Sequence, residues 1–309
     1  MRPIAPKQSP GPGSWACCAS RQETRARWDG EVDRLVVRVH GVTLEEGADV
    51  LDKRAAAEEL TGGNMAGAVR VGDSVHRAAG PWTATIHRLL RHLHAHGVVW
   101  VPQPIGLDED GREIVSYLPG TVPQDPMPEW VWADAVLAAA AERLAAVHDA
   151  TSGFDVKAGV WQLPVHQPVE VVCHNDFVPY NFVFDEDHTL IGVIDWDTAS
   201  PGPRVWDLAY LAYRLVPLGD PANRDRLGSD LSERRRRLVL LCQAYSRGLT
   251  PAAVATTAVA RLHDLANFTA ARAATGATHV AGHVKLYRDD ASWLGAHLTD
   301  LIQHEEFRS

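Results

Sequence analysis

Polar side chains of types that could bind metal or handle a proton recur at short intervals between residues 171 and 212. In the stretch "VVCHNDFVPYNFVF", His174, Asp176 and Asn181 lie between two apolar runs. Asp195 directly follows a further apolar run, "LIGVI", fourteen residues beyond Asn181. Unpaired polar groups beside buried strands cost free energy, so the stretch is either a well-satisfied structural corner or an active site.

The spacing of these residues suits one loop wrapped around a single point. Carboxylate and amide oxygens are hard ligands for Mg²⁺, and two such groups with phosphate oxygens form a typical nucleotide–metal site. A further carboxylate in the same loop could accept a hydroxyl proton. Asp195 taken alone would be a turn residue, and Asp197 stays open between a turn and a site residue. One histidine without a thiolate cluster does not make a zinc site.

The flanking sequence predicts the elements that position this loop. Residues 69–71 and the run at Val75 read as strands joined by a Gly72-Asp73 hairpin turn. A helix follows Pro81, and another strand pair ends at Pro119-Gly120. Helical patterns dominate from there to the end of the chain, which predicts an α+β fold with a small antiparallel β lobe and a larger helical lobe.

We expect three regions along the chain. Residues 1–40 carry Pro, Gly, Ser and Arg with little periodicity and are expected to be a disordered N-terminal extension. Residues 41–118 would form a nucleotide-binding N-lobe, and residues 119–309 a catalytic and acceptor-binding C-lobe. The hinge is expected near residues 116–121.

Composition narrows the class of protein. The 309 residues are 46% hydrophobic and 22% charged, with a formal net charge of −9. No basic stripe is long enough to follow a phosphate backbone, so no nucleic-acid partner is expected. The 4 cysteines form no CxxC pair, and no apolar run reaches membrane-spanning length. These features predict a cytoplasmic protein without a membrane partner.

The stretch "CHNDFVPYNFVF…LIGVIDWDTASPGPRVWDLA" resembles the aminoglycoside phosphotransferase and choline kinase superfamily, distant relatives of the protein kinases. The catalytic loop of that superfamily reads His-Gly-Asp-x4-Asn, and its second metal motif reads Ile-Asp-Trp/Phe followed by Asp-Leu-Ala. The resemblance covers roughly residues 59 to 300. It implies a protein-kinase-like fold of two lobes.

The resemblance also implies roles for the loop residues. Asp176 would be the catalytic carboxylate that faces the acceptor hydroxyl. Asn181 and Asp195 would hold Mg²⁺ against the phosphates of ATP or GTP. His174 and Asp207 would be structural residues of the catalytic loop.

The nucleotide lobe departs from the kinase pattern. Kinases place a Lys on the third strand, paired with a Glu on the following helix. Here the third strand reads "SVHRA", and Arg77, on the same face as Val75, is the natural substitute. The following helix contains no Glu, so His87 either takes the orienting role or is a surface histidine.

The remaining site residues are predicted by position. Gly62 and Gly63, in a glycine-rich turn, would allow the backbone to close over the phosphates. The backbone of Ser116 and Leu118 at the hinge would bind the nucleotide base. The acceptor would lie near the C-terminal helices, where acidic side chains meet cationic groups and an aromatic ring offers a stacking face; the candidates are Asp264, Asp289, Asp290 and Trp293.

The sequence thus predicts an ATP-dependent O-phosphotransferase acting on a small, cationic or hydroxylated acceptor such as an aminoglycoside, amino alcohol or sugar. The alternative is a catalytically impaired kinase-like module that binds a nucleotide or small ligand without phosphoryl transfer. The missing Lys–Glu pair favours this alternative, and the intact set of loop residues opposes it. A metal-dependent hydrolase would need a water-activating cluster, which the sequence does not offer.

Overall fold

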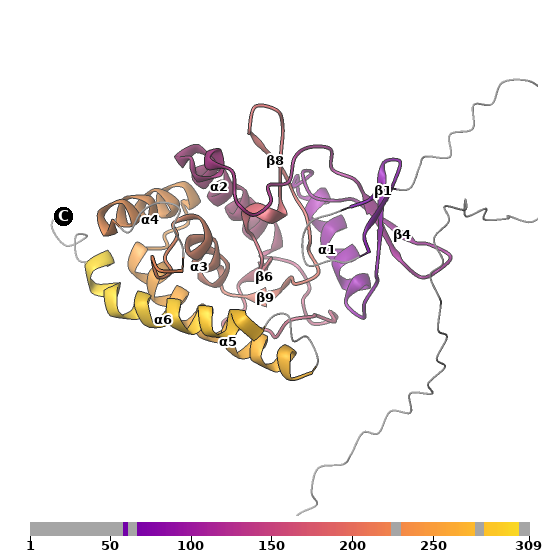
Figure 1. Cartoon of the computed structure of the whole chain (residues 1–309). Helices are drawn as coiled ribbons and strands as arrows, with labels where there is room; N and C mark the ends of the chain where they lie inside the picture. The colour runs from indigo at the N-terminus through magenta and orange to yellow at the C-terminus, as the bar shows by residue number, and fades with distance from the viewer. Residues whose placement is uncertain (1–57, 61–66, 224–229, 276–280, 303–309) are drawn as a thin grey trace, which may run out of the picture. The chain divides into compact units, whose positions relative to one another are not determined.

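A five-stranded antiparallel sheet begins the described part of the chain (Figure 1). The computed structural model describes residues 58–60, 67–223, 230–275 and 281–302. The predicted extension 1–40 and the turn residues Gly62 and Gly63 lie outside these ranges. The strand order is β1-β2-β3-β5-β4, with β1 at Glu58–Glu59, β2 at Val69–Val71, β3 at Ser74–Arg77, β4 at Pro104–Leu107 and β5 at Glu113–Ser116.

One helix, α1 (Thr83–Ala95), connects β3 to β4 in this small lobe. Its apolar side chains recur at helical spacing and are fully buried, namely Ile86, Leu89, Leu90 and Leu93. The chain leaves the helix through Gly97, whose φ of 85° is in the left-handed region that glycine adopts without strain.

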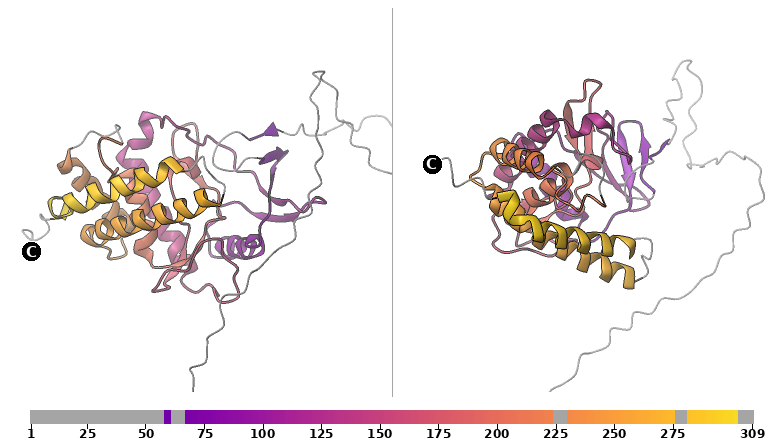
Figure 2. Two further views of the ribbon diagram at one scale, coloured as in Figure 1. Left: turned by 60° about the horizontal axis from the view of Figure 1, so that its bottom comes forward. Right: turned by 60° about the vertical axis from the view of Figure 1, so that its left-hand side comes forward.

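The larger lobe is mainly helical and carries two short β-ladders. After a 3-10 turn, η1 (Glu129–Trp132), come α2 (Asp134–Thr151), β6 (Val171–Cys173), η2 (Pro179–Asn181), β7 (Phe182–Phe184), β8 (Leu190–Val193), β9 (Ser200–Gly202), α3 (Arg204–Leu215), α4 (Leu231–Tyr245), α5 (Pro251–Ala274) and α6 (Ala281–Ile302). Strand β6 pairs with β9, and β7 pairs with β8. The long helices α5 and α6 lie side by side in both views of Figure 2. This arrangement is the α+β two-lobe fold that the sequence predicts.

None of the helices in the described ranges has the length and apolar character needed to cross a bilayer.

The hinge between the lobes is fixed by backbone pairing. The N–H of Thr121 donates to the carbonyl of Phe184 at 2.8 Å, and the N–H of Phe184 donates back to Thr121 at 2.9 Å. Gly120 has a φ of 148°, and a Cβ placed there would lie 2.6 Å from both the Phe184 carbonyl oxygen and Val183 Cγ1. Only glycine therefore allows the hinge to approach β7 this closely.

We expect Gly120→Ala to destabilise the protein by at least about 2 kcal/mol, because overpacking and an unfavourable backbone angle add together. Urea unfolding measures the loss. Gly153→Ala is the matched control, since a Cβ at Gly153 meets nothing within 4 Å; it should change stability by no more than about 0.5 kcal/mol. Equal stabilities for the two variants would contradict the close packing at the hinge.

Candidate functional site

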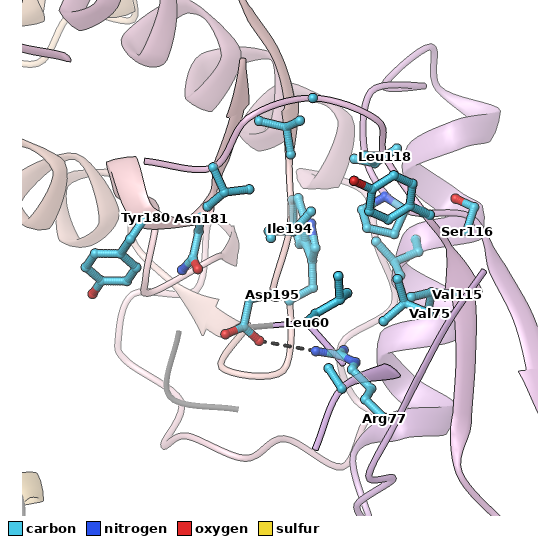
Figure 3. A pocket seen from close by; sticks show the side chains of 18 of the residues that line it. Leu60, Val75, Arg77, Val115, Ser116, Leu118, Tyr180, Asn181, Ile194 and Asp195 are labelled. Atoms are coloured by element: carbon cyan, nitrogen blue, oxygen red, sulfur yellow. Dashed lines mark hydrogen bonds and ion pairs between the residues drawn. The ribbon is translucent and has the colours of Figure 1, made fainter. Parts of the chain in front are cut away.

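A cavity of about 320 Å³ lies between the sheet and the loops of the larger lobe. Figure 3 shows Ser116 and Leu118 at one end of it and Arg77 with Asp195 at the other. The walls between these ends are largely apolar and come from both lobes, with Val75, Val115, Leu90, Val183 and Ile194 among them. Val75 and Val115 are direct cross-strand partners, so the β3–β5 pairing builds one wall.

Asp176 and Asn181 are joined within the loop that follows β6. The Asn181 amide nitrogen Nδ2 donates to Asp176 Oδ2 and to its backbone carbonyl, both at 2.9 Å. Tyr180 donates its hydroxyl to the other carboxylate oxygen, Asp176 Oδ1, at 2.7 Å. Asp176 is therefore held from both sides, and each of its oxygens keeps a lone pair for a further donor.

Asn175 provides the sharp turn before Asp176. Its φ is 67°, a left-handed angle that asparagine tolerates better than most side chains. Its Nδ2 donates to the Thr198 carbonyl and to Ser200 Oγ, each at 2.9 Å. Arg261 of α5 donates to the Asn175 carbonyl at 2.9 Å. Asparagine can thus stand where the related motif has glycine, because its amide ties the turn to the segment after β8.

His174 is fully buried and bonded to the loop backbone. Its Nε2 donates to the Ile194 carbonyl at 3.1 Å, and its Nδ1 accepts the Asp176 N–H at 3.3 Å. Burial lowers the pKa of His174, which keeps the ring neutral and able to accept at Nδ1. The imidazole joins the loop to β8 rather than pointing at a substrate.

Asp207, in the first turn of α3, fixes the start of the same loop. Its two oxygens accept the N–H groups of His174 at 2.7 Å and Asn175 at 2.9 Å. His148 of α2 lies 3.2 Å away through Nε2. Burial alone would raise the pKa of Asp207, but these hydrogen bonds outweigh it and hold the pKa below its usual value. The carboxylate therefore stays charged in the core and braces the loop.

Asp195 faces the cavity immediately after β8. Its backbone φ of 61° is left-handed, and such strained positions in non-glycine residues cluster at functional sites. Burial raises the pKa of Asp195 to about 6, although the nearby Arg77 opposes the shift. Arg77 Nη1 reaches Asp195 Oδ1 at 3.3 Å (Figure 3).

Arg77 is the centre of a cluster of three carboxylates. Its Nε donates to Glu113 Oε2 at 2.5 Å and its Nη2 to Asp197 Oδ1 at 2.6 Å, in addition to the contact with Asp195. Arg77 and Glu113 are cross-strand partners in the β3–β5 register. The carboxylate that orients the cation of β3 therefore comes from β5 and not from the following helix.

His87 is buried, with 7% of its surface exposed, so the expectation of a surface histidine is wrong. Its Nε2 lies 2.9 Å from Glu113 Oε1. The histidine does not touch Arg77 directly but holds the carboxylate that does. The physical reason is that Glu113, at 0% exposure, needs a partner for each oxygen once it is removed from water.

The cluster carries more negative than positive charge. One guanidinium faces the carboxylates of Glu113, Asp195 and Asp197. Within the described residues no donor reaches Asn181 Oδ1, and Asp195 Oδ2 is likewise without one. These hard oxygens beside uncompensated negative charge fit a divalent cation such as Mg²⁺ better than a soft metal.

At the hinge, Ser116 and Leu118 differ in whether the backbone N–H group already has a hydrogen-bond acceptor. The N–H of Ser116 donates to the Gln103 carbonyl at 2.9 Å, and that of Tyr117 to the Asp73 carbonyl at 2.8 Å. Among the residues that the structure describes, the N–H of Leu118 has no such acceptor. Leu118 is thus the hinge residue whose N–H can face a nucleotide base.

The acidic residues predicted to bind the acceptor form hydrogen bonds or ion pairs with other residues. Asp290 is fully buried and accepts hydrogen bonds from Tyr213, Asn223 and the backbone of Asp220. Asp289 pairs with Lys285 at 2.5 Å on the surface of α6. Asp264 lies 3.6 Å from Arg261.

Trp293 likewise has its faces occupied, by His297 in a stack and by the guanidinium of Arg234 at 4.6 Å. Within the described residues, none of the four candidate side chains forms a hydrogen bond or an ion pair with Asp176, Asn181 or Asp195.

The sequence analysis did not identify two residues that help to build the site, Glu113 and Tyr180. Glu113 lies two residues before Val115, so strand alternation puts it on the same strand face as Val115, which lines the cavity. The signal in the sequence was one acidic residue on an otherwise apolar strand face. Tyr180 lies inside the motif between Asp176 and Asn181, where a phenol four residues after the carboxylate can turn back to it.

Known proteins share sequence with this chain. The sequence matches the phosphotransferase enzyme family over residues 154–240, which include the loop after β6, β8 and α3. It is 31% identical over 194 residues to the trifolitoxin immunity protein of Rhizobium leguminosarum bv. trifolii, a match that covers 60% of this chain and 72% of that protein.

Solved structures share the fold. The ADP-bound aminoglycoside phosphotransferase APH(2'')-Ib superposes with a TM-score of 0.51 at 14% identity, covering 79% of this chain and 95% of that one. An ethanolamine kinase of Plasmodium vivax gives 0.53 at 10% identity, covering 73% and 78%. The two-lobe architecture is that of the protein-kinase-like small-molecule kinases. The chain belongs to the phosphotransferase enzyme family.

We expect Glu113→Ala to cost about 3 kcal/mol of stability, because it leaves a buried imidazole and part of a buried guanidinium without their partner. Thermal and urea unfolding measure this loss. Glu109→Ala, at an exposed position between β4 and β5, is the control and should stay within about 0.5 kcal/mol of the parent protein. If the two variants were equally stable, Glu113 would not be the anchor of Arg77.

Proposed function

We propose that the chain is a kinase that transfers the γ-phosphoryl group of ATP, or of GTP, to a hydroxyl of a small molecule with the help of Mg²⁺. The proposal is supported mainly by the fact that Asn181 and Asp195 line the same cavity. Asn181 is bonded there to the Asp176 carboxylate. In the proposed division of labour, residues 41–118 bind the nucleotide, and residues 119–309 carry the catalytic loop and the acceptor.

The nucleotide base fits the apolar part of the cavity. Val75, Val115 and Ile194 would cover its faces, and the Leu118 N–H would bind its edge. The phosphates would then extend toward Arg77. Of the three Arg77 contacts, the one to Asp195 is the longest, at 3.3 Å, so Arg77 can turn this N–H toward a phosphate oxygen while Glu113 and Asp197 keep it in place.

Asp176 would accept the hydrogen bond of the acceptor hydroxyl and hold its oxygen in line with the phosphoryl group. Tyr180 and Asn181 fix the carboxylate orientation before the acceptor arrives, which lowers the entropy cost of alignment. As the hydroxyl oxygen bonds to phosphorus, its proton passes to an Asp176 oxygen.

Asn181 and Asp195 are the residues that would hold Mg²⁺. The ion would supply positive charge to the phosphate oxygens as the bond to the leaving nucleotide breaks. Arg77 adds a second positive charge from the opposite lobe. Catalysis in this family of reactions consists mainly of positioning and charge stabilisation, so these few residues are sufficient.

A mass-shift screen for phosphorylated products tests the proposal. With Mg²⁺ and ATP or GTP, a panel of aminoglycosides, amino alcohols and hydroxylated acids should include an acceptor that gains a phosphoryl group. Asp176→Asn should lower the rate by about 10² to 10⁴-fold, the usual contribution of a positioned base, with nucleotide binding intact.

Asp187→Asn, in the exposed β7–β8 turn, is the matched control and should keep full activity. Nucleotide binding without any labelled acceptor, together with an Asp176→Asn variant that behaves like the parent, would favour the non-catalytic binding module instead.

Nucleotide binding should depend on pH through Asp195. Its pKa of about 6 lies above the ordinary value of 3.8, so burial favours the protonated form, whereas Mg²⁺ needs the carboxylate. We expect the affinity for the Mg²⁺–nucleotide complex to fall about tenfold per pH unit below pH 6, relative to an Asp195→Asn variant measured in parallel. Isothermal titration calorimetry from pH 5 to 8 provides the values.

The raised pKa of Asp195 also makes the stability of the metal-free protein depend on pH, and this stability falls as the pH rises. Asp195 contributes stability that is fully present below pH 3.8 and is lost as the pH rises through about 6. The comparison with Asp195→Asn removes the titration of the nucleotide itself. Parallel pH profiles for the two proteins would show that Asp195 is not the titrating ligand.

A further inference from the structure

Arg214 lies one aromatic ring away from the proposed catalytic carboxylate. It belongs to the last turn of α3 and is half-buried. Its Cζ atom is 5.3 Å from the centre of the Tyr180 ring, and the hydroxyl of that ring donates to Asp176 Oδ1 at 2.7 Å. A group bound to Asp176 would therefore have a guanidinium nearby.

The surroundings of Arg214 are aromatic rather than acidic. The groups that act on it most strongly are four tyrosines: Tyr180, Tyr210, Tyr213 and Tyr287. Burial raises the pKa of Tyr180 and of Tyr210, and the neighbouring charge of Asp176 adds to both shifts. Tyr180 and Tyr210 thus stay neutral at physiological pH and do not balance the arginine charge.

Three other buried arginines have a carboxylate nearby, while a fourth, Arg234, donates to the Gly219 carbonyl at 2.7 Å. Arg77 contacts Glu113 at 2.5 Å, Arg237 contacts Asp134 at 2.7 Å and Arg261 lies 3.6 Å from Asp264. Within the described ranges, Arg214 has neither a carboxylate at ion-pair distance nor a hydrogen-bond acceptor; its guanidinium lies over the Tyr180 ring instead. A partly desolvated guanidinium in this state costs free energy that an incoming anion can recover.

We infer that the acceptor carries an anionic group, a carboxylate or a phosphate, besides its reactive hydroxyl, and that Arg214 binds this group. The inference rests on the proposed function, which puts the acceptor hydroxyl at Asp176. The planar guanidinium presents paired donors that match carboxylate and phosphate oxygens. The acceptors favoured are hydroxy acids, hydroxyl-bearing amino acids, sugar acids and sugar phosphates.

A purely cationic acceptor fits this surface less well. Its amines would lie near Arg214, and the three acids predicted to meet them already have partners. Asp264 and Asp289 are paired with Arg261 and Lys285, and Asp290 is buried. Like charges at short range weaken binding.

Equilibrium titration with matched probes tests the inference without requiring turnover. The probes share a scaffold and differ in one substituent: glycerate, glycerol 3-phosphate, glycerol and 3-amino-1,2-propanediol, then the hexose series of glucuronate, glucose 6-phosphate, glucose and glucosamine. The whole chain is titrated by NMR with and without ADP and Mg²⁺. At least one anionic member should bind about tenfold or more tightly than its neutral counterpart, the usual gain from a charged hydrogen bond.

Three variants identify the residue responsible. Arg214→Gln should remove the tenfold preference for the anion, Arg214→Lys should keep part of it, and Asp176→Asn should keep it. The two anionic substituents separate a carboxylate acceptor from a phosphate acceptor. Equal binding of anions by Arg214→Gln, tighter binding of the amines, or no anion binding by the parent protein overturns the inference.

Thermal unfolding separates binding from a structural role. Arg214→Gln loses no ion pair and should keep the melting temperature of the parent, whereas Arg237→Gln, which loses Asp134 and the carbonyls of Trp132 and Leu215, should lower it. An equal fall for Arg214→Gln with unchanged anion binding would make Arg214 structural. If the proposed function alone is wrong, anion binding at Arg214 persists while phosphoryl transfer is absent.

Discussion

The arrangement of the site depends on Arg77, a single buried cation that bridges the two lobes. Glu113 holds it from within the sheet, and Asp195 and Asp197 reach it from the segment after β8. Ions withdrawn from water are tolerated only with close partners, because the desolvation cost of each is several kcal/mol. The sheet and the segment after β8 are therefore held at a separation that suits all four side chains together.

The loop after β6 is stabilised separately, by hydrogen bonds within the larger lobe. Asp207 accepts the two N–H groups at the start of the loop, and Asn175 supplies the turn that directs Asp176 outward. These contacts are fully buried and do not involve the sheet. The loop geometry is thus kept by the larger lobe alone, while the contact between the sheet and the segment after β8 depends on Arg77.

The sequence could predict the local part of this site and not the long-range part. The residues from His174 to Asp195 lie in one short stretch, so their spacing alone indicates a shared point, and the apolar flanks indicate the strands. The partner of Arg77 could not be found in this way. Glu113 lies 36 residues further along, and only the β3–β5 register, in which the helix α1 and β4 intervene, makes the two neighbours.

The predicted acceptor-binding residues also depend on long-range packing that the sequence does not reveal. Asp289 and Asp290 are adjacent on α6, yet one is exposed with Lys285 and the other is buried with Tyr213. The helix face that each presents depends on how α6 packs on the helices before it. Residue type in a helical segment does not carry that information. Arg214 belongs to this class too, since the lack of a countercharge becomes visible only in three dimensions.

The backbone bridge between Thr121 and Phe184 has a mechanical consequence. Phe184 ends the strand β7, and Asn181 immediately precedes the first residue of that strand. A rotation of one lobe about the connecting segment therefore pulls on the strand that carries the asparagine amide. If the cavity holds a nucleotide and its ion as proposed, a single motion would open the cavity and loosen the ion, so the two would leave together rather than one after the other.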